Sequence, residues 1–400
     1  MLQRARFSVS AGFFLFAAVM GSWAPRLPAV KERLALSNGD LGLALLGLAV
    51  GFVVATRIAP ALIHRFTSAP VLRASTAGLC LSLVGPAVAG DLVALTLALG
   101  AMGIAGGLCD VAVNAQAVVV ERTWGRPLMS GFHALWSLGA MLAGGTAAGA
   151  ARAGMSTTLH FSIAAVFLLA ASGASLRWLV PRADEHDRAE RERRDAPDLS
   201  AASAAVLLLG LIAFASFIAE GSVADWSAVY LREGLGAAPA AAALAFTAFS
   251  GAMALCRLLS GALVMRLGPI LVARAGGLLA AAGLSFALVV RSVPAAIAGF
   301  TVLGVGLAPI VPLAFSAAGN TGPRSSSTIL GRVVMMGYLG SIVGPVVIGF
   351  AADRIGLRGA LFFPVALACL AALCAPRVRA VDVVLTEPAG ARAPEKMTWR

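Results

Sequence analysis

Long apolar stretches follow one another along nearly the whole chain, separated by short polar connections. A helix needs about 20 mainly apolar residues to cross a bilayer, and each stretch is about 18–29 residues long. The pattern therefore predicts an all-α membrane protein with twelve transmembrane helices. The predicted spans are residues 7–25, 41–63, 70–89, 92–120, 128–151, 156–180, 200–224, 239–264, 270–290, 294–318, 328–352 and 358–376.

The two halves of the chain resemble each other when one is shifted by 201 residues. The shift aligns Glu32 with Glu233, Arg65 with Arg266, Arg73 with Arg274, Gly103 with Gly304 and Gly139 with Gly340. Since these rarer residue types fall at equivalent places, we expect two pseudo-symmetric six-helix bundles. The predicted parts are an N-terminal bundle (1–180), a charged cytoplasmic linker (181–199), a C-terminal bundle (200–376) and a cytoplasmic tail (377–400).

Charge is scarce and follows the predicted topology. Charged residues make up 12% of the chain, about half of their share in a soluble domain. Most of the 31 Lys and Arg residues lie in connections on the N-terminal side, which predicts a multi-pass protein of the cytoplasmic (inner) membrane with both termini in the cytoplasm. The net charge of +12 therefore does not indicate a nucleic-acid partner. The first span also has the pattern of a signal peptide, but the repeat requires it as the first helix.

The fourth span carries polar groups along one side of an otherwise apolar helix. At about 100° per residue, Asp110 and Asn114 lie within about 40° of each other. An ionisable group in a membrane span is costly and is usually directed toward a polar interior. We therefore expect Asp110 to bind a proton or a substrate group, and Asn114 and Gln116 to bind substrate. A hydrogen bond between helices is the structural alternative for all three, and Gln116 points some 240° away from Asp110.

Further polar residues in the spans are weaker candidates. Glu220 in the seventh span is a second candidate for binding a proton or substrate, and His133 and Trp136 at the start of the fifth span are others. A pairing of His133 with Glu121 is equally compatible with the sequence. Asp225 and Trp226 are expected at the headgroups. Arg257 is either a counter-ion for an anionic substrate or extends to the cytoplasmic surface.

Glycine and proline interrupt two corresponding spans, the fourth and the tenth. The residues are Gly103, Gly106 and Gly107 in one span and Gly304, Gly306, Pro309 and Pro312 in the other. Corresponding interruptions in the two halves of a transporter mark its binding site. Close helix packing is the competing interpretation, because Gly103 and Gly107 form a GxxxG step.

Residues 60–67 and 261–268 are two weakened copies of the signature G-x-L-A-D-R-x-G-R, each after the second span of its half. Arg65 and Arg266 are retained, while His64 and Met265 replace the acid. With six plus six helices, the chain thus resembles the major facilitator superfamily. Segments 110–122, 127–139 and 219–227 resemble its MosC-like branch. The resemblance implies a gating loop at Arg65 and Arg266, and a site drawn from spans 1, 4, 7 and 10.

Together these observations predict a secondary active transporter that moves a small molecule by alternating access, coupled to protons, with a sugar- or polyol-like substrate. A drug or metabolite efflux antiporter is one alternative, and a non-transporting membrane receptor or scaffold is another. The sequence shows no nucleophile–base pair, phosphate loop or metal-ligand spacing. We accordingly expect no enzyme activity, cofactor or metal, and the partners we expect are substrate, protons and lipid around a monomer.

Overall fold

The computed structural model describes residues 2–125, 128–180, 204–319 and 326–381. The predicted linker and residues 382–400 of the predicted tail lie outside these ranges. All regular elements within the ranges are helical. Eleven of the described helices are long and apolar enough to cross a membrane, and a shorter apolar helix spans Phe362–Val378. The predicted fold class is confirmed.

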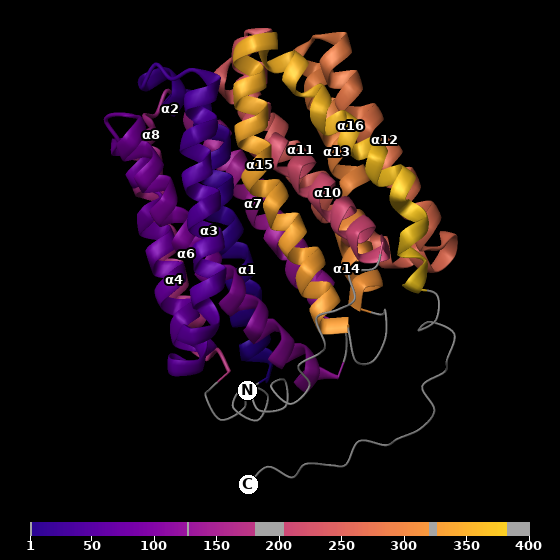
Figure 1. Cartoon of the computed structure of the whole chain (residues 1–400). Helices are drawn as coiled ribbons and strands as arrows, with labels where there is room; N and C mark the ends of the chain where they lie inside the picture. The colour runs from indigo at the N-terminus through magenta and orange to yellow at the C-terminus, as the bar shows by residue number, and fades with distance from the viewer. Residues whose placement is uncertain (1, 126–127, 181–203, 320–325, 382–400) are drawn as a thin grey trace, which may run out of the picture.

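The first half of the chain forms the indigo to purple group of helices in Figure 1. Its elements are α1 (Leu2–Trp23), η1 (Ala24–Arg26), α2 (Leu27–Arg33), α3 (Asn38–Phe66), α4 (Ser68–Ser82), α5 (Gly85–Val88), α6 (Leu92–Trp124), α7 (Met129–Arg152), α8 (Thr157–Ser175) and η2 (Leu176–Trp178). Helices α1, η1 and α2 follow one another without a loop, as do α8 and η2. The six predicted spans of this half all correspond to these helices.

The second half forms the pink to yellow group beside it (Figure 1). Its elements are α10 (Ala204–Val229), the π-helical turn η3 (Tyr230–Gly234), α11 (Pro239–Leu267), α12 (Pro269–Val290), α13 (Val293–Leu307), α14 (Ile310–Gly319), α15 (Ser326–Ala360), α16 (Phe362–Cys374) and η4 (Ala375–Val381). The eleventh and twelfth spans meet at Gly356, whose φ of 74° is a left-handed conformation that suits glycine.

Side-chain caps fix where several of these helices begin. Ser37 and Asp40 form a reciprocal capping box at the start of α3, so two backbone N–H groups that the helix itself cannot satisfy have partners. Asp91 before α6, Ser156 before α8 and Ser292 before α13 cap these helices through a single hydrogen bond, which the side chain accepts from a backbone N–H. Each capping residue follows a turn between two apolar spans, so the polar connections set the helix starts.

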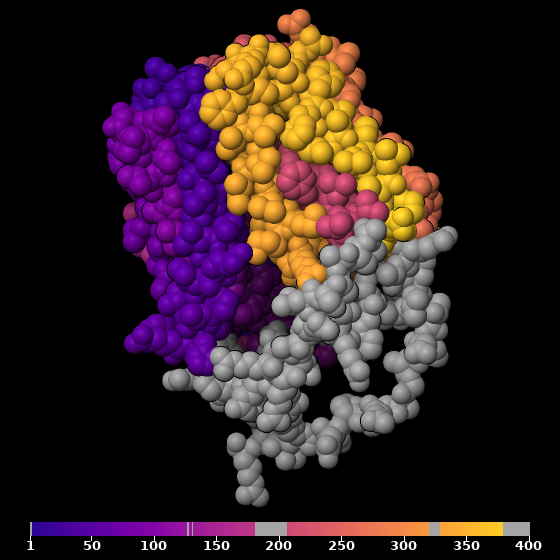
Figure 2. All heavy atoms as spheres, in the orientation of Figure 1, coloured from indigo at the N-terminus to yellow at the C-terminus, as the bar shows by residue number. Residues whose placement is uncertain are grey.

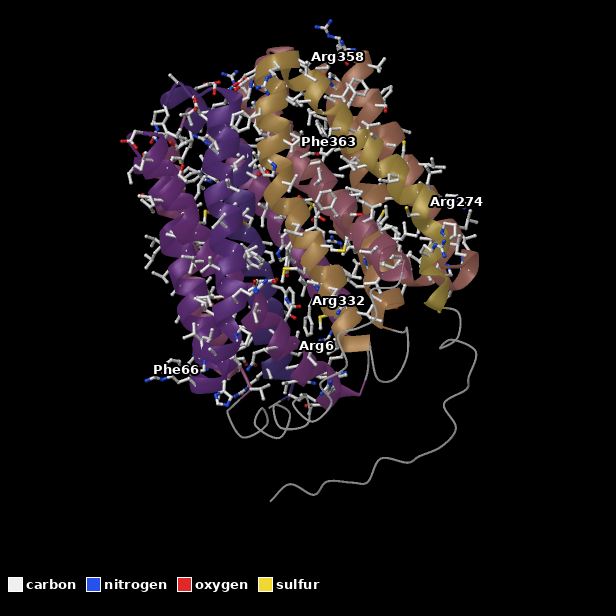
Figure 3. The ribbon with its side chains drawn as sticks, in the orientation of Figure 1. Arg6, Phe66, Arg274, Arg332, Arg358 and Phe363 are labelled. Atoms are coloured by element: carbon white, nitrogen blue, oxygen red, sulfur yellow. The ribbon has the colours of Figure 1, made fainter. Side chains whose placement is uncertain are left out.

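The bundle has two ends, which we name by the chain. The terminus-side end is where α1 begins and where α6 ends at Trp124, and the far end is where α3 begins at Asn38. Figure 3 marks them, with Phe66 at the terminus-side end of the first half and Arg358 at the far end of the second. Between the two halves, α3 packs against α15 and α7 packs against α11.

At the far end the two halves are joined by ion pairs. Lys31 Nζ lies 2.5 Å from Glu233 Oε1, and Arg232 lies 2.9 Å from Glu32 Oε1. Lys31 is only 8% exposed. The Asp353 carboxylate of α15 also accepts hydrogen bonds from the backbone N–H groups that begin α3, at 3.0 and 2.8 Å. These contacts close the interface between the halves at this end.

Candidate functional site

Asp110 lies on α6 at the boundary between the two halves. The Tyr338 hydroxyl, on α15 of the second half, donates a hydrogen bond to Asp110 Oδ2 at 3.2 Å. Asn114 donates to Asp110 Oδ1 at 3.2 Å and to the Asp110 carbonyl oxygen at 2.9 Å. The acid thus faces the other half and not the lipid, and no basic residue pairs with it among the described residues.

Two aromatic rings pack against the ring of Tyr338. The Tyr338 ring meets Phe52 of α3 edge to face at 5.4 Å and Phe217 of α10 at 5.8 Å between centroids. Such edge-to-face contacts hold a ring in a defined orientation. The Tyr338 hydroxyl is therefore held against the carboxylate by helices from both halves.

A second polar group lies one helical turn along α10 from Phe217. Glu220 Oε2 is 3.6 Å from an Arg257 guanidinium nitrogen of α11, and the two side chains are 27% and 13% exposed. Arg257 also donates to Ser137 Oγ on α7 at 2.9 Å, so this group too joins the halves. Asp110, Asn114, Tyr338, Glu220, Arg257 and Ser137 are hereafter called the inter-half cluster.

His133 and Trp136 lie beside this cluster on α7. The His133 ring is 5.1 Å from Phe13 of α1, and Trp136 is 6.3 Å from Phe16. The alternative pairing of His133 with Glu121 is wrong, because Glu121 Oε2 accepts from the backbone N–H groups of residues 128 and 129 and so caps α7. Roles of His133 and Trp136 in binding stay predictions.

Gln116 does not belong to the site. Its amide nitrogen donates to Ser68 Oγ at 2.6 Å, and its amide oxygen accepts from the Val180 N–H at 2.9 Å. The fully buried side chain therefore joins α6 to α4 and to Val180, two residues after the end of η2. Its expected contact with substrate is wrong, since six residues of an α-helix turn it away from Asp110.

The expected interruption of α6 is wrong as well. The helix runs unbroken from Leu92 to Trp124. A Cβ at Gly103 would overlap the Leu48 carbonyl, and one at Gly107 would overlap that of Phe52. These glycines let α3 approach closely, which is the packing alternative. Gly106 instead faces the rings of Phe16 and Phe52.

In the second half the corresponding segment is broken. Helix α13 ends at Leu307, α14 begins at Ile310, and Ala308 and Pro309 form a turn between them. Neither Pro309 nor Pro312 can donate the backbone hydrogen bond that would continue the helix. Gly304 and Gly306 allow close packing against α11 and α12. The break is confirmed, and a role for it in binding stays a prediction.

Two of the residues considered for the membrane surfaces, Trp226 and Arg257, lie elsewhere, and the two arginines of the expected gating loop make no ion pair in the described part of the chain. Trp226 is 0% exposed within the bundle, so its expected place at the headgroups is wrong. Arg257 lies in the inter-half cluster and does not extend to the terminus-side surface. Arg65 and Arg266 are exposed at the ends of α3 and α11 with no ion pair among the described residues, so their gating role stays a prediction.

Sequence reasoning missed Tyr338 and Ser137, which make the two hydrogen bonds of the cluster that cross between the halves. They occupy equivalent repeat positions, since Ser137 shifted by 201 residues falls on Tyr338. The repeat alignment and the choice of helices facing the other half are thus the signal that would have found them. A comparison of the two halves by residue identity misses this pair, because serine and tyrosine are different residue types.

Helices in two halves, with carboxylates and an arginine held between them, define a polytopic membrane protein of the transporter class. Models of two families match, the "Major Facilitator Superfamily" over residues 208–399 and the "Transmembrane secretion effector" over residues 4–207. The chain belongs to the major facilitator superfamily. It is a multi-pass membrane protein of a transporter family and not an enzyme.

Curated relatives agree with the predicted branch. An uncharacterized MFS-type transporter of Yersinia pestis is 33% identical over 387 residues, covering 96% of this chain and 94% of the relative. An uncharacterized transporter of Sinorhizobium fredii is 34% identical, covering 92% and 96%. Membrane protein MosC of Rhizobium meliloti is 29% identical, covering 91% and 88%. The resemblance to the MosC-like branch is confirmed.

Solved structures show the same fold at low sequence identity. A point mutant of the nucleoside transporter NupG has a TM-score of 0.73 at 13% identity, covering 93% of this chain and 98% of that chain. A D-xylose–proton symporter has a TM-score of 0.70 at 16% identity, covering 92% and 95%. A bacterial homologue of Spinster, inward-facing and unoccupied, has a TM-score of 0.73 at 15% identity, covering 95% and 97%.

Proposed function

We propose that this protein is a proton-coupled secondary transporter that moves a small molecule by alternating access. The observation that carries the proposal is the Tyr338–Asp110 hydrogen bond between the two halves, at 3.2 Å. A carboxylate without a basic partner can change its charge by taking up a proton. Because its partner lies on the other half, that change alters a contact that must rearrange when the halves move.

The proposed orientation places both termini in the cytoplasm of a cell with an inner membrane. It rests on the excess of Lys and Arg in connections at the terminus-side end. In that orientation the ion pairs of the far end close the outer side. Figure 2 supports an inward-facing state, since the surface below α15 recedes to more distant magenta atoms of the first half.

A hydroxyl-bearing solute, such as a sugar or polyol, is the proposed substrate class. Asn114, Ser137 and the Glu220–Arg257 pair offer both donors and acceptors, and such groups can bind hydroxyls in either role. The solved proteins of this fold include a nucleoside transporter and a xylose symporter. A thermal-shift screen of the purified protein against sugars, polyols, amines and drugs tests the class.

Proton coupling is tested in liposomes with purified protein and the solute found in that screen. Asp110→Asn has nearly the shape of the protonated acid but cannot release a proton. We expect this variant to lose accumulation driven by an imposed pH gradient, and its transport rate to lose its dependence on pH, while exchange of labelled for unlabelled solute continues.

Asp91→Asn is the matched control, because Asp91 is on the same helix and caps its far end. Asparagine caps helices about as well as aspartate, so accumulation should continue in this variant. Accumulation by Asp110→Asn at the wild-type level would remove Asp110 from proton coupling. Binding of a solute by wild-type protein without accumulation or exchange would favour the receptor or scaffold alternative.

Efflux is a second candidate direction, and one finding favours it. The family model that matches residues 4–207 describes a secretion effector. Loaded liposomes with an opposite pH gradient distinguish the two directions. Solute leaving against its own gradient, with proton entry, would identify an antiporter.

A further inference from the structure

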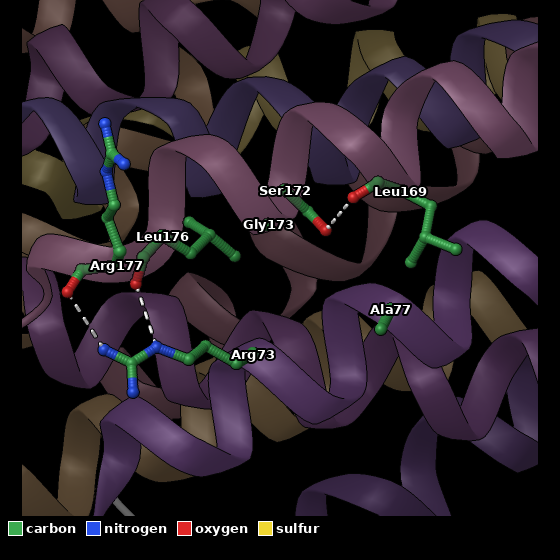
Figure 4. Close-up of a pocket in the computed structure, with 7 residues that line it drawn as sticks. All are labelled: Arg73, Ala77, Leu169, Ser172, Gly173, Leu176 and Arg177. Carbon is green, nitrogen blue, oxygen red and sulfur yellow. Dashed lines mark hydrogen bonds between the residues drawn. The ribbon is translucent and has the colours of Figure 1, made fainter.

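A basic pocket lies between α4 and α8, on a surface of the first half that is away from the inter-half cluster. Its volume is about 620 Å³ and it is lined by Arg73, Arg177 and Ser172 together with the apolar side chains of Ala77, Leu169 and Leu176. Figure 4 shows the two arginines at one end of the pocket and Leu169 at the other. The arginines mark the terminus-side end, where η2 finishes.

A smaller pocket of about 460 Å³ is lined by Gln3, Arg4, Phe7 and Trp178, and Trp178 follows Arg177 of the first pocket in the chain. The Arg177 guanidinium stacks 4.0 Å from the Trp178 ring centroid, and Arg4 lies 5.9 Å from the same centroid. The Phe7 ring meets Trp178 at 6.0 Å. The two pockets thus lie on either side of residues 177 and 178, and this basic and aromatic region is hereafter called the α4–α8 groove.

The positive charge of this groove is not compensated by the described part of the protein. Arg73 uses two guanidinium nitrogens to bind the Leu176 and Arg177 carbonyl oxygens, at 2.9 and 3.3 Å. Among the described residues, the Arg4 and Arg177 side chains make no hydrogen bond or ion pair, and no carboxylate pairs with Arg73. Arg4 and Arg177 lie at the Trp178 ring and Arg73 binds the backbone of the same turn, so three arginines line this region without a carboxylate partner from the described ranges.

An apolar surface continues from the groove along α8. Gly173 leaves open space where a side chain would stand. One to two turns further into the bilayer, Val166 and Phe167 are each 69% exposed. Guanidinium groups beside a tryptophan, with a lipid-facing apolar strip leading away from them, match a phosphate headgroup and its acyl chains.

We propose that the α4–α8 groove binds one anionic phospholipid, with its phosphate at Arg4, Arg73 and Arg177 and its acyl chains along α8. Arginine suits this role because its planar fork pairs with phosphate oxygens and keeps its charge. The groove is separate from the transport path, so its test does not depend on the proposed transport function.

Native mass spectrometry of the full-length protein with phosphatidylglycerol or phosphatidylcholine tests this proposal. We expect one phosphatidylglycerol to be retained preferentially, with a preference that weakens as salt rises. Arg177→Gln should weaken that binding about fivefold, the effect of one basic residue near an anionic surface. Arg177→Lys keeps the charge and should retain much of the binding.

Arg274→Gln is the matched control. Arg274 is the repeat counterpart of Arg73 on α12, is exposed, and lies in the second half near the terminus-side end (Figure 3). The control removes the same charge and should leave the retained lipid in place. If Arg177→Gln misfolds, Arg4→Gln replaces it, since the Arg4 side chain makes no hydrogen bond in the described structure.

Three results would overturn the proposal. Equal loss of lipid in the Arg177→Gln and Arg274→Gln variants would show a general effect of charge. Equal retention of phosphatidylglycerol and phosphatidylcholine would show that the anionic headgroup is not recognised. Displacement of the lipid by millimolar inorganic phosphate would show a site for the free anion instead.

Discussion

The far end and the inter-half cluster join the same two halves with different symmetry. At the far end the repeat positions pair reciprocally, because Lys31 corresponds to Arg232 and Glu32 to Glu233. Each base binds the acid of the other half. In the cluster, Asp110 corresponds to Val311 and Glu220 to Val19, so each charge occurs in one half alone.

This difference in symmetry suggests different tasks: the far end holds the two halves closed, and the inter-half cluster recognises the solute. Two reciprocal pairs hold two pseudo-symmetric surfaces together without favouring any one solute. An asymmetric cluster presents a particular arrangement of donors, acceptors and charge, as a solute without that symmetry requires. Substitutions at the far end should therefore change which state the protein adopts, whereas substitutions in the cluster should change what it binds and carries.

The largest effect is expected at Arg257. Arg257→Gln leaves the half-buried Glu220 carboxylate without its partner and removes the hydrogen bond to Ser137. A hydrogen bond made by a charged group contributes about 1.5–3 kcal/mol, and an ion pair that is partly exposed adds up to about 1 kcal/mol. We expect transport to fall about 100-fold. Exchange measured in liposomes checks it, with a melting curve to confirm that the variant is folded.

The exchanged pair Glu220→Arg with Arg257→Glu sharpens this prediction. Exchange of the charges does not restore the contact with Ser137, so transport should stay low. Recovery to wild-type transport would show that the cluster needs only an ion pair, and that it does not matter which half carries each charge partner.

A smaller effect is expected at the far end. Glu233→Lys replaces one of the two ion pairs by two like charges, while Arg232 and Glu32 stay paired. One such pair contributes up to about 1 kcal/mol, so the equilibrium should shift about fivefold toward the state open at the far end. Labelling of a cysteine introduced at Ala237, which is buried beside Arg232, with a membrane-impermeant thiol reagent measures the shift.

Here the exchanged pair Lys31→Glu with Glu233→Lys should restore the closed state, unlike the exchange at Arg257. The reciprocal arrangement tolerates exchange because each position needs only an opposite charge. Labelling that stays high in the double variant would show that opposite charge alone does not close the far end, and would contradict the contrast with the inter-half cluster.

Tyr338→Phe should have a still smaller effect, because the hydrogen bond that it removes is long, at 3.2 Å. It keeps the ring between Phe52 and Phe217 and removes only the hydroxyl that donates to Asp110. A hydrogen bond of this length contributes about 0.5–1 kcal/mol, so we expect about a threefold loss of pH-driven accumulation. Exchange should be less affected, and equal loss of both would assign Tyr338 to substrate binding.

Sequence alone predicted the helices well and the site in part. Apolar runs of membrane-spanning length do not depend on the neighbouring helices, so all twelve spans correspond to helices of the structure. Asp110 and Glu220 stood out because a charge in an apolar run is unusual. Tyr338 and Ser137 did not, since ordinary polar residues acquire their role only when two halves meet.

The glycines show why the breaks and close contacts of the helices could not all be predicted from the sequence. Gly103 and Gly304 occupy equivalent positions, yet α6 is continuous and its counterpart is broken at Pro309. Glycine leaves both outcomes open because a neighbouring backbone decides between them. Only the proline acts through its own covalent structure, so the break that could be predicted was the one with proline.

The smallest effect on transport is expected at Gln116, which lies outside both regions of the comparison. Gln116→Ala removes the buried hydrogen bonds to Ser68 Oγ and from the Val180 N–H, at a cost to stability of about 1–3 kcal/mol. We expect a lower melting temperature with exchange and pH-driven accumulation near the wild-type level. Asn114→Ala on the same helix is the contrasting variant, because it should lower transport more than stability. A transport defect in Gln116→Ala as large as that of Asn114→Ala would mean that the whole polar surface of α6 serves the solute, and that the inter-half cluster is too narrowly drawn.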